Sequence, residues 1–259
     1  MNPILEHNRR VWDERVRQNA RFTAPASEED FRNPYKLLDG ANWLGGNVAG
    51  QTILCLGAGG AKHGPLLASQ NAHVTVVDIS AEMLQLDRQC AAERKLTLEL
   101  VQASIDDLSA LPQSHYDVVI QPVSTCYVPD IRHAYREVAR VIKPEGIYIS
   151  RHKQPINLQT GLVPSPNGFS IRESYYTNGP LSPDAQSGPH RESGTLEFLH
   201  RWGDLLGGLC QAGFVIEDVA EPRFGQPDAK PGTFEYRGQF IPPYIQIKAR
   251  RSAKPIWTP

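Results

Sequence analysis

The residues best suited to chemistry in this 259-residue chain are a glycine-rich turn and an aspartate that follows it. The turn, GAGG at residues 57–60, comes directly after an apolar run at residues 52–56. Glycine has no Cβ and an unrestricted φ, so the backbone of such a turn can approach a bound ligand closely. Asp78 ends the next valine-rich run, about 20 residues on, where a carboxylate can accept hydrogen bonds from both ribose hydroxyls of a nucleoside. The alternative without a ligand is a tight turn and a helix-capping aspartate.

The spacing of the glycines distinguishes between nucleoside ligands. A dinucleotide-binding turn follows the pattern G-x-G-x-x-G, and its third glycine allows close helix–strand packing beneath the pyrophosphate. Counted from Gly57, the sixth position of this chain is Lys62. The sequence therefore disfavours a nicotinamide-dependent oxidoreductase and favours a nucleoside ligand without a diphosphate.

The elements that must position these residues alternate between strand and helix. Apolar patterning predicts strands at residues 52–56, 73–78, 96–102, 116–120 and 146–150, and helices at residues 3–20, 61–70, 80–94, 130–142 and 196–212. Two further strands, 214–219 and 244–249, are predicted to pair antiparallel at the sheet edge. Such alternation implies an α/β fold, a doubly wound and mostly parallel seven-stranded sheet covered on both faces.

The pattern also divides the chain into four segments. They are an N-terminal helical cap (1–50), a cofactor-binding core (51–152), a lid or substrate insertion (153–195) and the C-terminal part of the core sheet (196–259). The insertion is rich in proline and glycine and carries aromatic residues, a composition that suits a lid over a small apolar molecule. A linker without a binding role is the alternative for this segment.

Composition excludes several classes of function. Lys plus Arg number 27 and Asp plus Glu 28, so the chain lacks the basic excess of a nucleic-acid-binding protein. No run approaches the roughly 20 apolar residues of a membrane helix, and the N-terminus has no apolar signal core, which predicts a cytoplasmic protein without a membrane partner. The cysteines are expected to be reduced thiols without metal-binding spacing, at Cys55, Cys90, Cys126 and Cys210.

The motifs over residues 51–150 resemble those of the class I S-adenosylmethionine-dependent methyltransferases, of the type that acts on small molecules. The resemblance is carried most clearly by ILCLGAGG at residues 53–60, VTVVDISAEML at residues 74–84 and REVARVIKPEGIYIS at residues 136–150. The opening NRRVWDERV, residues 8–16, is similar to the N-terminal cap helix of small-molecule members. The resemblance implies a Rossmann-like methyltransferase fold, with S-adenosyl-L-methionine as cofactor.

The resemblance also implies where the cofactor would be held, from its methionine part through its ribose to its adenine. The corresponding positions are, in that order, Gly57, Ala58 and Gly59; then Asp78; then Ile79, Met83, Ser104 and Ile105, with Gln121 in the fourth-strand motif YDVVIQPVS. Four positions depart from the family pattern, because Cys55 replaces an acid, Ala61 and Glu145 each replace a glycine, and Ser104 replaces a common aspartate. These departures keep a second hypothesis open, a non-catalytic nucleoside-cofactor-binding protein with a methyltransferase-like fold.

The acceptor of the methyl group is expected beyond the carboxyl ends of the fourth and fifth strands. His152 is the predicted general base, because its position is right and its unperturbed pKa suits neutral pH. Anchoring the start of the lid is the alternative role of His152. Tyr127 is expected either to orient a small-molecule acceptor or to pack under the lid. Arg151 and Lys153 could bind an acidic substrate or simply face solvent.

Overall fold

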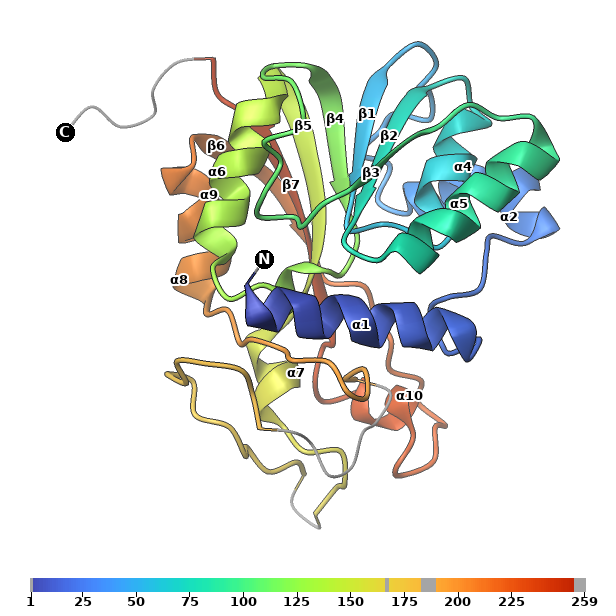
Figure 1. Cartoon of the computed structure of the whole chain (residues 1–259). Helices are drawn as coiled ribbons and strands as arrows, with labels where there is room; N and C mark the ends of the chain where they lie inside the picture. Colours follow the sequence, from blue (N-terminus) through green and yellow to red (C-terminus); the bar gives the residue numbers. More distant parts are fainter. Residues whose placement is uncertain (1, 166–167, 183–189, 254–259) are drawn as a thin grey trace.

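The computed structural model describes residues 2–165, 168–182 and 190–253, which form a seven-stranded sheet flanked by helices (Figure 1). The strand order across the sheet is β3-β2-β1-β4-β5-β7-β6. The strands are β1 (Thr52–Leu56), β2 (His73–Asp78), β3 (Glu99–Gln102), β4 (Tyr116–Gln121), β5 (Ile142–Lys153), β6 (Phe214–Ala220) and β7 (Tyr244–Arg251). The longer helices are α1 (Pro3–Arg17), α5 (Ala81–Arg94) and α6 (Ile131–Val141).

Short helices complete the described part of the chain. They are α2 (Glu28–Arg32), α3 (Pro34–Leu38), α4 (His63–Ala68), η1 (Thr125–Tyr127), α7 (Pro155–Gln159), α8 (Trp202–Leu205), α9 (Gly207–Gln211) and α10 (Phe234–Arg237). The first five strands pair parallel, whereas β7 pairs antiparallel with both β5 and β6. The predicted doubly wound sheet with an antiparallel edge is therefore confirmed.

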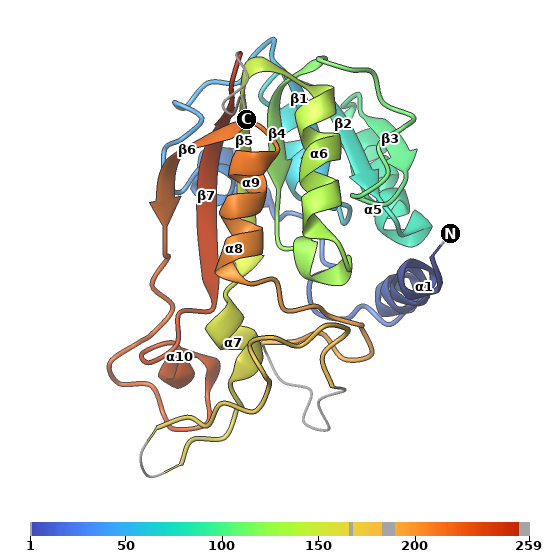
Figure 2. The same cartoon turned by 90° about the vertical axis from the view of Figure 1, so that its left-hand side faces the viewer.

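Both faces of the sheet are covered, because alternate residues of a strand point to opposite sides. In β1, Ile53 and Cys55 pack in one apolar cluster with residues of α3, α4 and α5. Leu54 and Leu56 pack in a second cluster with residues of α6, α8 and α9 (Figure 2). The first strand is consequently buried on both sides, which fixes the position of the glycine turn that follows it.

Helix α1 is held at the carboxyl ends of the strands by polar contacts to three distant segments. Asp13 accepts a hydrogen bond from the hydroxyl of Ser80, the N-cap of α5, at 2.7 Å. The Asn8 side chain donates to the carbonyls of Tyr127 and Leu196, both at 3.0 Å, and accepts from the Leu196 N–H at 2.8 Å. Both side chains are buried, so α1 forms a wall over this edge of the sheet.

Two predicted elements differ from the structure. Residues 196–201 are extended rather than helical, because Phe198 donates its N–H to the Cys126 carbonyl at 2.7 Å and Glu197 accepts from the Leu181 N–H at 2.7 Å. The fifth strand was expected to end at residue 150, yet β5 continues to Lys153, since residues 151–153 pair with β7. The predicted lid lies only partly within the described residues, since 166–167 and 183–189 fall outside them.

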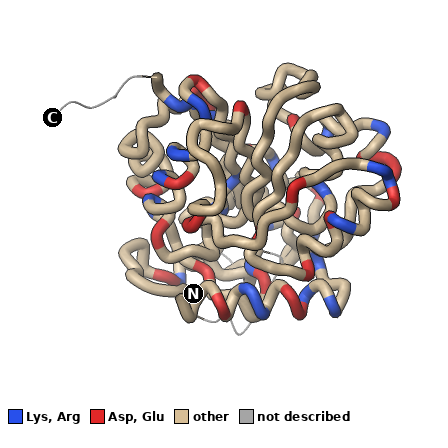
Figure 3. The backbone as a smooth tube through the Cα atoms, turned by 45° about the horizontal axis from the view of Figure 1, so that its top comes forward, with Lys and Arg blue, Asp and Glu red and all other residues tan. Residues whose placement is uncertain are grey.

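Charged residues of both signs are interspersed along the described chain (Figure 3). In the described ranges no helix is both long and apolar enough to cross a membrane. The same ranges contain no cluster of three or more His, Cys, Asp or Glu residues arranged to hold a metal ion. Cysteines 55, 90, 126 and 210 are free thiols.

Candidate functional site

A pocket of about 440 Å³ lies between the carboxyl ends of the parallel strands and α1. This volume lies within the range of about 300–1,000 Å³ that is typical of small-molecule sites. Tyr127 lines this pocket. So do all of the predicted cofactor-binding positions, which are Gly57, Ala58, Gly59, Asp78, Ile79, Met83, Ser104, Ile105 and Gln121. The structure thus brings together residues from the ends of β2 and β4, the loops after the first three strands and, for Met83, helix α5.

The glycine turn is packed so tightly that larger residues would not fit. Gly57 has a φ of +59°, and a Cβ there would lie 2.6 Å from the Ser124 hydroxyl oxygen. A Cβ on Gly59 would lie 2.8 Å from the Met83 Cβ and 3.0 Å from Asp78 Oδ2. The turn therefore brings backbone, rather than side chains, up against the ends of β2 and β4.

Asp78 is held in place by two backbone hydrogen bonds. Its Oδ2 accepts from the Gly59 N–H and its Oδ1 from the Ser80 N–H, both at 2.9 Å. Burial raises the pKa of this carboxyl to about 6, although the backbone donors oppose the shift. Each oxygen keeps a further lone pair, so a pocket-facing carboxylate remains able to accept from ribose hydroxyls.

A second carboxylate, that of Asp87 on α5, supports the same turn from beneath. Its Oδ2 accepts from the Gly60 N–H at 2.8 Å, and burial raises its pKa to about 7. The following residue, Ala61, has a φ of +58°, a conformation that costs a non-glycine residue about 1–2 kcal/mol. The glycine expected at position 61 is thus absent while the backbone conformation that favours glycine is retained.

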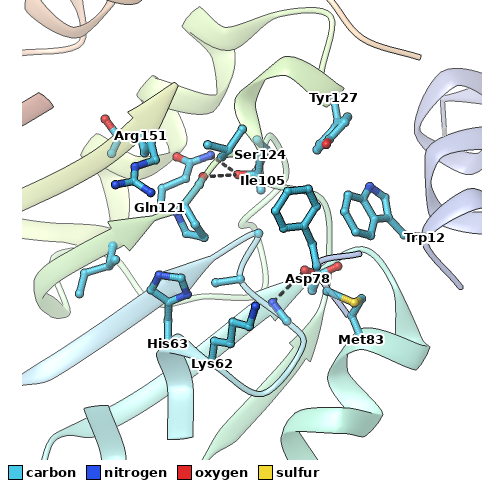
Figure 4. A pocket seen from close by; sticks show the side chains of 18 of the residues that line it. Trp12, Lys62, His63, Asp78, Met83, Ile105, Gln121, Ser124, Tyr127 and Arg151 are labelled. Atoms are coloured by element: carbon cyan, nitrogen blue, oxygen red, sulfur yellow. Dashed lines mark hydrogen bonds between the residues drawn. The ribbon is translucent and has the colours of Figure 1, made fainter. Parts of the chain in front are cut away.

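A short chain of polar contacts orders the pocket wall that is formed by the end of β4 and the loop after β3. The Gln121 amide, almost fully buried at the end of β4, donates to the Ser124 hydroxyl at 2.9 Å and accepts from the Tyr148 hydroxyl. The Ser104 hydroxyl donates to Asp106. These contacts fix the rotamers of Gln121 and Ser104 next to the apolar Ile105, as Figure 4 shows for Gln121, Ser124 and Ile105.

Tyr127 joins the pocket to the described segment that begins at residue 190. Its hydroxyl donates to Glu192 Oε2 at 2.6 Å, and its ring stands edge-on to Trp12 with 5.7 Å between centroids. The Lys153 ammonium contacts Glu192 at 2.6 Å and Glu197 at 3.0 Å, and all three side chains are buried. Burial and the neighbouring carboxylate of Glu192 raise the pKa of Tyr127 well above its usual value, so its hydroxyl stays protonated.

Three nitrogen-bearing side chains line the pocket from α4 and β5. They are Lys62 and His63, at the start of α4, and Arg151 on β5 (Figure 4). Burial, with the charges of Lys62 and Arg151, lowers the pKa of His63 to about 4. At neutral pH this histidine is therefore uncharged, and the positive charges of this group are those of Lys62 and Arg151.

This geometry fits a nucleoside cofactor, and comparison with known proteins decides which one. Residues 54–150 match the family described as "Methyltransferase domain". Residues 54–150 form a methyltransferase domain of the class I S-adenosylmethionine-dependent type. S-adenosylmethionine is accordingly the cofactor of this methyltransferase, and the resemblance drawn from the sequence motifs is confirmed.

Two curated relatives show how far the similarity of the methyltransferase extends along the chain. The uncharacterized methyltransferase YbaJ of Bacillus subtilis is 29% identical, and the alignment covers 87% of this chain and 93% of that protein. The ubiquinone biosynthesis O-methyltransferase of Klebsiella pneumoniae is 32% identical, but over only 49% of this chain and 56% of that protein. The chain thus spans nearly all of the first relative and about half of the second.

Solved structures share the fold of this methyltransferase. An S-adenosylmethionine-dependent methyltransferase from Mesorhizobium loti has a TM-score of 0.65 and 24% identity, over 83% of this chain and 100% of that one. The geranyl diphosphate C-methyltransferase of Streptomyces coelicolor has a TM-score of 0.64 and 16% identity, over 96% of this chain and 98% of that one. Both extend the shared fold beyond residues 54–150.

One predicted site residue of the methyltransferase, His152, does not line the pocket. Its ring is fully buried, with Nδ1 bonded to the Thr125 hydroxyl at 2.9 Å and Nε2 to the Ser150 hydroxyl at 2.7 Å. Burial lowers its pKa to about 3, so it is a poor proton acceptor. His152 was expected beside the methyl group because the predicted strand ends at residue 150. In the structure His152 lies within β5 and points away from the pocket, while its neighbour Arg151 lines it.

Several other residues that line the pocket of the methyltransferase were not predicted from the sequence. Glu192, Tyr244 and Gln246 line the pocket but come from the lid and from β7, where no local motif marks them. Trp12 had a signal, because it lies in the stretch NRRVWDERV that resembles a cap helix. Cys55, by contrast, does not line the pocket. It is buried in the apolar cluster that packs β1 against α3, α4 and α5, and burial raises the pKa of its thiol.

Proposed function

We propose that this chain transfers the methyl group of S-adenosylmethionine to a small-molecule acceptor held in the pocket of about 440 Å³. The observation that carries the proposal is the enclosure of one continuous pocket by α1, the strand ends and Glu192 of the lid segment. A pocket roofed in this way suits a small molecule better than a folded macromolecule. The names of two relatives, an O-methyltransferase of ubiquinone biosynthesis and a C-methyltransferase of geranyl diphosphate, are in keeping with it.

The cofactor-binding residues have separate roles in this proposal. Asp78 accepts from the ribose hydroxyls, and the glycine turn lies along the methionine part. Ile79 and Met83 pack against the adenine, while Ser104 and the Ile105 N–H read its edge. The Lys62 ammonium, next to the turn, pairs with the carboxylate of the methionine part. When bound, the cofactor supplies an electrophilic methyl group on a sulfonium.

The chain's own contribution to methyl transfer is orientation rather than proton abstraction by His152. Tyr127 donates its hydroxyl proton to Glu192, which fixes the hydroxyl oxygen as a hydrogen-bond acceptor, and Gln121 is fixed by Tyr148 and Ser124. Such preset groups hold an acceptor in line with the methyl group, and alignment alone can lower a barrier by about 7–11 kcal/mol in favourable cases. The acceptor's proton leaves to solvent or to a basic group of the acceptor itself.

A label-transfer screen tests this function. The protein is incubated with methyl-labelled S-adenosylmethionine and, separately, with a small-molecule extract, total RNA and a protein fraction. We expect labelled product only in the small-molecule arm, identified by a mass increase of one methyl group. Label in RNA or protein instead would contradict a small-molecule acceptor. Binding of S-adenosylhomocysteine with no labelled product in any arm would favour the non-catalytic alternative.

A further inference from the structure

Arg151 is a half-buried cation that lines the pocket without an ion-pair partner in the described part of the chain. Its contacts there are with uncharged groups. The guanidinium lies 5.8 Å from the centroid of the Tyr244 ring. With the Gln246 amide oxygen turned toward it, that oxygen accepts from two guanidinium nitrogens of Arg151 at 2.6 and 3.1 Å. One terminal nitrogen of the fork is left for another partner.

The neighbouring cation on the same strand shows what a compensated charge looks like here. Lys153, two residues further along β5, is more deeply buried than Arg151 and is paired with both Glu192 and Glu197. Removing a charge from water without a counter-charge is unfavourable, and arginine does not lose its proton to relieve that cost. An uncompensated cation at a pocket wall is therefore a candidate for ligand binding.

The surroundings of Arg151 favour an anion. Lys62 adds a second cation to the same pocket and forms no ion pair with any residue that the structure describes. The lowered pKa of His63 reports both charges, since Lys62 and Arg151 each contribute to the shift. Asp78 lies across the pocket from Arg151 (Figure 4), and the charge of Glu192, the other described carboxyl that lines the pocket, is paired with Lys153. An acidic group of a ligand would thus be attracted to the β5 side and repelled from the ribose side.

We propose that Arg151 binds an oxyanion, a carboxylate or phosphate, carried by the methyl acceptor. The inference rests on the proposed function, since it names the chemical class of that acceptor. Lys62 lies beside the glycine turn, where the methionine carboxylate of the cofactor is expected, whereas Arg151 lies on β5 opposite Gln246 and belongs to the acceptor side. The guanidinium fork is held by Gln246, so its orientation is set before the acceptor arrives.

Three matched probes test the charge requirement: benzoate, phenyl phosphate and the neutral benzamide. Each is titrated calorimetrically into wild-type protein saturated with S-adenosylhomocysteine. We expect at least one anion to bind tenfold or more tightly than benzamide, and which anion it is distinguishes carboxylate from phosphate. Arg151→Gln should lose that preference, whereas Arg136→Gln, an exposed arginine on α6, should keep it. Benzamide binding as tightly as both anions, no anion binding at millimolar concentration, or an unchanged preference in Arg151→Gln would overturn the proposal.

A second comparison separates the acceptor from the cofactor. S-adenosylhomocysteine and 5′-methylthioadenosine share the adenosine part, but only the first carries a carboxylate. Arg151→Gln is expected to leave both affinities within twofold of wild type, and Lys62→Gln to weaken S-adenosylhomocysteine alone. If Arg151→Gln weakens S-adenosylhomocysteine alone, Arg151 holds the cofactor and the proposal is overturned. If wild-type protein binds neither adenosine compound, the proposed function fails instead, and the anion titration without cofactor still reports on Arg151.

Discussion

The two sides of the pocket are built in different ways. The side that we assign to the cofactor consists of strand ends and the turns directly after them, with Asp78 fixed by the backbone N–H groups of Gly59 and Ser80. The acceptor side joins residues far apart in the chain, such as Tyr127 to Glu192 and Arg151 to Gln246. Local backbone geometry holds the first, whereas buried charge and long-range pairing hold the second. Binding a cofactor that a whole superfamily shares requires only the cofactor side of the pocket to stay the same among its members.

The largest effect is expected on the acceptor side, from Lys153→Met. The change leaves Glu192 and Glu197 buried without their shared cation, and breaking a buried ion pair in this way costs about 3–5 kcal/mol. Chemical denaturation should show this loss in the free energy of unfolding. Lys248→Met is the matched control, because the ion pair of Lys248 with Glu217 is partly exposed and should contribute less than about 1 kcal/mol. Equal losses in the two variants would contradict the role assigned to the buried cluster.

A smaller effect is expected between the two sides, from His152→Asn. The variant loses ring contacts and at least one of two buried hydrogen bonds, which should lower the free energy of unfolding by about 1–3 kcal/mol. Turnover of the acceptor found by label transfer should stay within threefold of wild type at a temperature where the variant is folded. Loss of a general base would reduce turnover by about 10²–10⁴-fold. A loss of that size in folded variant protein would restore His152 as the base.

The smallest effect is expected at the cofactor side, from Ala61→Gly. Glycine relieves the cost of the positive φ at position 61 but loses a buried methyl group and stabilises the unfolded chain. These contributions nearly cancel, so the free energy of unfolding should change by less than about 0.5 kcal/mol. Ala91→Gly, at a buried helical position with ordinary φ, should instead lose about 1–2 kcal/mol. Equal losses at the two positions would show that the turn is not strained.

The same contrast explains what could be predicted from the sequence. Period-2 and helical patterns gave the sheet and its antiparallel edge, and the glycine turn with Asp78 marked one wall of the pocket. The extended residues 196–201 were predicted as helix because local pattern says nothing of their backbone pairing with Cys126 and Leu181. His152 was predicted to be a base because position after a strand does not tell which neighbour faces the pocket. Register with β7 decides that, and register is a long-range property.

The central claim is that Asp78 holds the ribose of S-adenosylmethionine, and a pH series of S-adenosylhomocysteine titrations tests it most directly. The pKa of Asp78 is about 6, so the acceptor form needed for two ribose hydroxyls is present above that pH and lost below it. Wild-type affinity should therefore be level from pH 8 to 7 and fall by up to tenfold per pH unit below 6. Asp78→Ala should bind about 100-fold more weakly at pH 8, as expected for two lost hydrogen bonds to a charged group. The affinity of Asp78→Ala for S-adenosylhomocysteine should not show the fall below pH 6 that protonation of Asp78 causes in the wild type. An affinity unchanged in Asp78→Ala at pH 8 would contradict the account.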